Sequence, residues 1–155
     1  LLMACTTGSF GYDHFDDEGV KAWREAAPRA IAALGDRGIH RAAGARMGEE
    51  QPGLHALYQA IDRLSFGLDK VEVGNRIRAM RTRGAADAAR IGCPVHFVIG
   101  EEDLLICPRG IERVAATLPN ATLVTVPKSG HSVYFERAAL FNAELSAFLG
   151  RIGWA

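Results

Sequence analysis

The sequence lacks an excess of charge of either sign, and it lacks any long hydrophobic run. It has 18 Lys and Arg residues against 18 Asp and Glu residues. This balance gives no reason to expect a nucleic acid or an anionic membrane surface as a partner. No apolar stretch approaches the roughly 18 residues that a membrane-spanning helix needs. With 155 residues, 48% of them hydrophobic, the chain is long enough for one domain with a sizeable core.

Cysteine is also scarce. Cys5, Cys93 and Cys107 are odd in number and too far apart for the usual zinc-ligand spacing. We therefore expect reduced thiols in a cytoplasmic protein rather than disulfides. The sequence accordingly predicts no metal site and no cofactor.

The hydrophobic residues that are present indicate an α/β fold. Two short runs rich in β-branched residues, Val95 to Ile99 and Leu123 to Val126, are typical of strands buried on both faces of a parallel sheet. Between them, Pro108 to Leu118 carries apolar residues at helical spacing. A strand, a helix and a strand make one right-handed crossover. A further strand is expected at Leu2 to Thr6, and a last helix that ends at Gly150.

Two residues of acid–base type lie where the predicted strands end. The run PVHFVIGEED ends on Asp103, and ATLVTVPKSGH ends on His131. Because parallel strands deliver their carboxyl ends to one edge of a sheet, we expect the two side chains to be neighbours there. This placement predicts part of a catalytic site. Glu101 and Glu102 compete with Asp103 for the acidic role, and any of the three could instead be solvated loop charge.

From about Ile91 to Leu149 the chain resembles the closing part of an α/β-hydrolase. The landmarks are I-x-C-P before a strand, G-x-x-D after it, and G-H followed by an aromatic residue, Glu136 and a final helix. The resemblance implies that Asp103 is the acid of a catalytic triad and His131 its base, in the chain order usual for this fold. It also implies hydrolysis of a small ester-like or related substrate.

The nucleophile of such a triad is missing from the sequence. In this fold it normally occupies a strand-to-helix elbow, often written G-x-S-x-G, and no serine has that frame, including Ser9 in TTGSFG. No aspartate has a comparable frame either. We therefore expect that the chain is the second half of a larger hydrolase, whose missing N-terminal half would supply the nucleophile and further strands. We expect residues 1–155 alone to be inactive.

The region before Ile91 has a different character. Helical patterns run from Asp16 or Asp17 to Gly35, with a restart at Pro28, and from Leu54 to Leu68 through four turns. Helices without intervening strands resemble the inserted helical cap of the family. The expected organisation is thus a core strand and the start of a linker in residues 1–12, a cap in 13–90, and the C-terminal α/β core in 91–155.

Several residues also have structural explanations. Trp23 and Tyr58 could face a pocket under the cap, but aromatic residues on an apolar helix face are more often packing. Ser132 is expected to have no role, and the arginines at 76, 78, 81 and 83 are expected to form a solvated face. A non-catalytic ligand-binding protein and an autonomous interaction domain are the alternative functions. The expected partner is a small-molecule substrate, and a homo-oligomer is left open.

Overall fold

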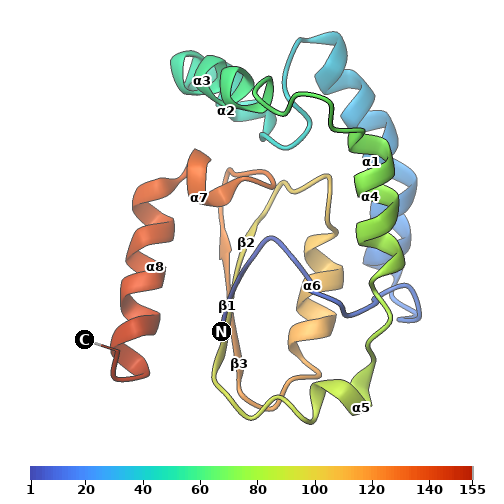
Figure 1. Ribbon diagram of the computed structural model, residues 1–155, viewed down its shortest axis with the longest axis vertical. Coiled ribbons are helices and arrows are strands. Elements are labelled where there is room, and N and C mark those ends of the chain that lie inside the picture. The colour runs from blue at the N-terminus through green and yellow to red at the C-terminus, as the bar shows by residue number, and fades with distance from the viewer. Residues whose placement is uncertain (155) are drawn as a thin grey trace.

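A three-stranded parallel sheet forms the centre of the computed structural model, which describes residues 1–154 (Figure 1). The strands are β1 (Leu2–Ala4), β2 (Val95–Gly100) and β3 (Ala121–Val126), and they lie side by side in that order. Met3 pairs with Phe97, and Phe97 with Leu123. The predicted α/β class is confirmed.

Helices cover both faces of this sheet, because β2 is apolar on both sides. Its residues alternate between the two faces, and all six are buried. Phe97 and its alternate neighbours pack toward α6 (Pro108–Ala115), whereas Val98 packs with residues of β3, α7 (Val133–Glu136) and α8 (Ala138–Arg151). In Figure 1 the sheet lies between α8 on one side and α6 on the other. β3 differs from the prediction: Thr122 and Thr125 are exposed, since β3 is the last strand of the described sheet.

Five helices connect β1 to β2, and we call this segment, residues 18–88, the helical insertion. They are α1 (Glu18–Asp36), α2 (Ala45–Glu50), α3 (Pro52–Asp62), α4 (Lys70–Ala79) and α5 (Ala85–Ala88). α1 lies outside α6, and α2 and α3 lie beyond the end of the sheet, on the side of α7 (Figure 1). No helix among residues 1–154 combines the length and the apolar character that crossing a membrane requires.

Two predicted helix boundaries were wrong. α1 continues through Pro28, which is exposed, so that water can satisfy the carbonyl that proline leaves without a donor. The helix predicted from Leu54 to Leu68 ends at Asp62 instead, and Gly67 follows with a φ of +68°, a left-handed conformation that glycine adopts without strain. The side chain of Asp69 then caps α4 through the backbone N–H groups of Val71 and Glu72.

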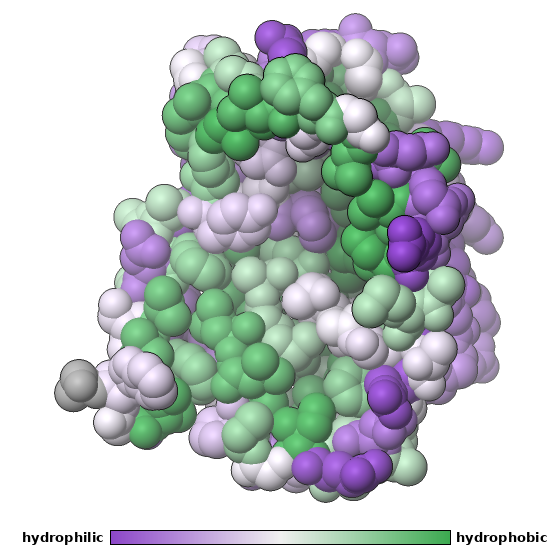
Figure 2. All heavy atoms as spheres, in the orientation of Figure 1, coloured by the Kyte–Doolittle hydropathy of each residue, from purple (hydrophilic) through white to green (hydrophobic). Residues whose placement is uncertain are grey.

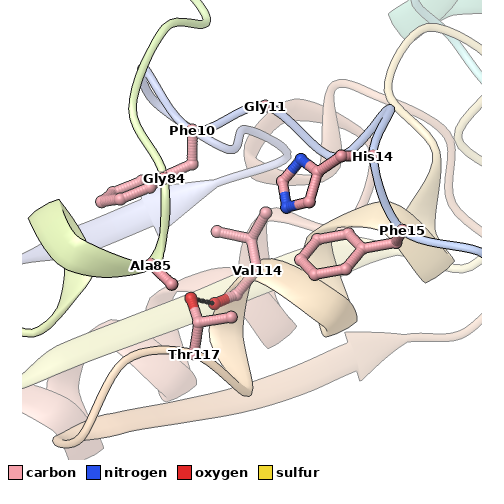
Figure 3. A pocket seen from close by; sticks show the side chains of 8 residues that line it. All are labelled: Phe10, Gly11, His14, Phe15, Gly84, Ala85, Val114 and Thr117. Atoms are coloured by element: carbon pink, nitrogen blue, oxygen red, sulfur yellow. Dashed lines mark hydrogen bonds between the residues drawn. The ribbon is translucent and has the colours of Figure 1, made fainter.

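A small cavity lies between the β1–α1 connection, the start of α5 and the end of α6 (Figure 3). Its volume is about 40 Å³, and its lining is mostly apolar, with the rings of Phe10, His14 and Phe15 around Val114. The cavity contains neither Asp103 nor His131 in its lining. It is therefore separate from the candidate site described next.

Candidate active site

Asp103 and His131 meet beyond the carboxyl ends of β2 and β3. The last residues of these strands, Gly100 and Val126, are paired in register, so the loops that follow them begin side by side. Nδ1 of His131 lies 2.9 Å from Oδ2 of Asp103. The structure thus brings together the two residues that the sequence places at one edge of the sheet.

The carboxylate of Asp103 is held by backbone groups as well as by the imidazole. Its Oδ1 accepts hydrogen bonds from the backbone N–H groups of Leu105 (2.8 Å) and Ile106 (3.0 Å). The residue is 1% exposed. From the insertion, the indole N–H of Trp23 donates to the backbone carbonyl of Asp103 at 2.9 Å. One carboxylate oxygen is therefore held by the backbone, and the other is aimed at His131.

This contact determines what the imidazole can do. An ionised carboxylate only accepts hydrogen bonds, so Nδ1 of His131 carries the hydrogen in this pair. In the neutral ring Nε2 is then an acceptor, which is the state a general base requires. The side chain of His131 is 29% exposed, while that of Asp103 is fully buried. The pair is thus a buried carboxylate behind a partly exposed imidazole.

The two competing carboxylates have other partners. Oε1 of Glu102 accepts from the guanidinium of Arg46 at 2.8 Å, and Oε2 of Glu101 accepts from the backbone N–H of Lys128 at 3.1 Å. Asp103 is the one of the three whose carboxylate contacts His131.

Cys5 lies beside this pair, and the sequence did not predict that position. It follows β1 with a φ of 46°, and its thiol, the Asp103 carboxylate and the His131 imidazole offer ligand atoms within 4.8 Å of one another. Burial, and then the charge of Asp103, raise the pKa of Cys5 to about 12. A protonated thiol is neither a good nucleophile nor a ready metal ligand. Its place at the end of a strand of the same sheet was the signal that could have found it.

Two further polar groups flank His131. Ser132 is fully buried, and its hydroxyl is hydrogen bonded to that of Tyr58, 2.7 Å away. Glu136, also buried, accepts from the backbone N–H groups of Gly130 and Gly44. Burial raises the pKa of the Glu136 carboxyl, although these N–H groups oppose the shift. The sequence predicts Tyr58 as packing and no role for Ser132, because a hydrogen bond between a helix and a distant loop leaves no periodic pattern.

Comparison with known proteins identifies the family. The family model described as "Alpha/beta hydrolase family" matches residues 2–144. The chain belongs to the alpha/beta hydrolase family. A carboxylate and an imidazole side by side at the carboxyl edge of the sheet agree with this membership.

Solved alpha/beta hydrolases share the fold at low sequence identity. Est816, described as an N-acyl homoserine lactone degrading enzyme, is 21% identical, with a TM-score of 0.64 over 95% of this chain and 56% of its own. A thermophilic esterase from Thermogutta terrifontis is 18% identical, with a TM-score of 0.64 over 98% of this chain and 56% of its own. MGS-M2, from a Medee basin deep-sea metagenome library, is 20% identical, with a TM-score of 0.62 over 96% and 55%.

The present chain therefore spans little more than half the length of these solved proteins. At such identities the likeness shows the fold alone. The catalytic roles of Asp103 and His131 stay predictions.

Proposed function

We propose that Asp103 and His131 are the acid and the base of a catalytic triad in a hydrolase that acts on a small ester or a related substrate. The observation that carries this proposal is the 2.9 Å contact between Nδ1 of His131 and Oδ2 of Asp103. Nε2 of His131 takes the proton of the nucleophile, or of an attacking water, and returns it to the leaving group. Asp103 holds the ring in the required tautomer and stabilises its charged form.

The nucleophile and the oxyanion-hole donors come, in this proposal, from an N-terminal half of the hydrolase fold. Two facts support it: the sequence contains no nucleophile elbow, and the chain covers 56% of the solved esterase. Residues 1–155 alone would then not turn over esters. The nucleophile also decides which bond is cleaved.

The helical insertion is proposed to be a cap, within residues 13–90, over a core made of residues 1–12 and 91–155. Figure 2 shows hydrophobic side chains gathered over α3, above a hollow in the surface. Leu57 and Ile61 of α3, and Leu64 shortly after it, are 52%, 50% and 66% exposed. Exposed apolar side chains on a cap are suited to contact an apolar part of a substrate.

The acid assignment can be tested in the full-length protein with Asp103→Asn. The amide keeps the shape but stabilises the wrong tautomer of His131, so kcat for p-nitrophenyl esters is expected to fall by about 10²–10⁴. Glu102→Gln is the matched control, because it removes a neighbouring carboxylate that bonds Arg46 instead, and kcat should stay within about threefold.

Equal kcat for wild type and Asp103→Asn would refute the acid role. If the folded wild-type protein binds ester analogues and turns none over, the non-catalytic ligand-binding function is favoured.

A further inference from the structure

The two residues that flank His131 in the chain are both held by the helical insertion. Ser132 donates its backbone N–H to the carbonyl of Ala42 at 3.0 Å. Its hydroxyl is hydrogen bonded to Tyr58 of α3 at 2.7 Å. The ring of Tyr58 packs edge-on against Phe135, with 5.1 Å between centroids. α3 therefore reaches the residue immediately after His131 through a specific polar contact.

On the other side of His131, a single carboxylate joins the same two regions. The backbone N–H of Gly130 lies 3.0 Å from Oε2 and 3.1 Å from Oε1 of Glu136. Oε2 also accepts from the backbone N–H of Gly44, at 3.0 Å. Gly44 is the residue before α2. Glu136 thus ties the residue before His131 to the insertion.

The backbones in this region are in direct contact. A Cβ atom at Gly130 would lie 2.4 Å from the nitrogen of Gly44, and one at Gly44 would lie 2.9 Å from the nitrogen of Gly130. A Cβ atom at Gly100 would lie 2.0 Å from the carbonyl oxygen of Gly130. No side chain separates these segments, so residues 42–44 cannot move toward the core without moving Gly130.

We propose that the helical insertion positions His131, with Tyr58 and Glu136 as positioning residues. Tyr58 acts through Ser132, and Glu136 acts through Gly130 and Gly44. Together they hold the backbone of residue 131 where its Nδ1 reaches Asp103. An insertion that moves away from the core would loosen the pair, so its docking and the readiness of the base are coupled. The expected effect on catalysis rests on the proposed function, whereas the positioning of His131 beside Asp103 does not.

The test uses Tyr58→Phe in the full-length protein. This change removes one hydroxyl and keeps the ring that packs on Phe135. Tyr134→Phe is the matched control. It likewise removes one tyrosine hydroxyl, at a position two residues after Ser132 in the chain, but Tyr134 is 49% exposed and Ser132 is hydrogen bonded to Tyr58 instead. Three quantities are measured: kcat, KM, and the downfield proton resonance of the His131 Nδ1–H, which is assigned by its absence in His131→Ala.

For Tyr58→Phe we expect kcat to fall about tenfold with KM within about twofold, because the base is misplaced and not the substrate. The Nδ1–H resonance should broaden or move upfield, because its bond to Asp103 lengthens. Tyr134→Phe should change neither. Ser132→Ala should reproduce the effect, and the double variant Tyr58→Phe/Ser132→Ala should lose no more than either single variant.

The contradicting results are equally specific. If Tyr58→Phe lowers only the melting temperature, with kcat and the resonance unchanged, the contact merely docks the insertion and the inference is wrong. Should Tyr58→Phe prevent folding, Ser132→Ala gives the same test from the other partner. If His131→Ala retains full activity, the proposed function fails, yet the Nδ1–H resonance of Tyr58→Phe still decides the positioning.

Discussion

The core around β2 and the part of the helical insertion that contains α3 and α4 are stabilised in different ways. Every residue of β2 is buried, and Phe97 and Ile99 are completely inaccessible. In the insertion, Val20 of α1 belongs to the same hydrophobic cluster as Phe97, but α4 has no buried residue and Phe66 is mostly exposed. The core is therefore fixed by its own packing, whereas α4 depends on helix caps and the docking of α3 on polar contacts to the His131 loop. The difference explains how an insertion can adjust a site that the core already holds.

Truncation of one phenylalanine in each region should show the largest contrast in stability. Phe97→Ala leaves a cavity in the core and is expected to lower the free energy of unfolding by about 3–5 kcal/mol. Phe66→Ala removes a side chain that is 85% exposed, so its effect should stay within about 0.5 kcal/mol. Urea denaturation of the full-length protein measures both, and similar losses would contradict the contrast.

Replacing one glycine in each region sharpens the comparison with a smaller effect. Gly100→Ala brings Cβ against the backbone of Gly130 and Ser129, which cannot yield easily, and should destabilise by about 1–3 kcal/mol. Gly74 lies within α4, where an added methyl group would meet no heavy atom within 4 Å. Gly74→Ala should therefore stabilise by about 0.5–1 kcal/mol through its helix propensity. A destabilised Gly74→Ala would show that α4 packs more tightly than its exposure indicates.

The difference in burial between the core and the insertion also decides which elements could be predicted from the sequence. β2 and α6 were found close to their true limits, because burial on both faces of a strand and on one stripe of a helix leaves a regular apolar pattern. A helix was predicted as far as Leu68 because exposed apolar residues beyond Asp62 continue the helical pattern. The helix nevertheless ends at Asp62, and the backbone turns at Gly67. Periodicity reports apolar residues, and these do not always lie in a helix.

The residues of the candidate site also differ in whether the sequence could predict them. Asp103 and His131 could be paired in advance, since strand ends and the order of the chain place both at one edge. Tyr58 and Ser132 could not, because their contact joins segments that are far apart in the chain. Cys5 offered one signal, its place directly after a strand of the same sheet.

The most direct test of the account is the activity of His131→Ala in the full-length protein, with His14→Ala as the control. His14 is exposed and lines only the small cavity of Figure 3, so its replacement should leave kcat for p-nitrophenyl esters unchanged. His131→Ala should lower kcat by about 10²–10⁴ while the protein stays folded. A folded His131→Ala protein with wild-type kcat would contradict the central claim that the imidazole beside Asp103 is the catalytic base.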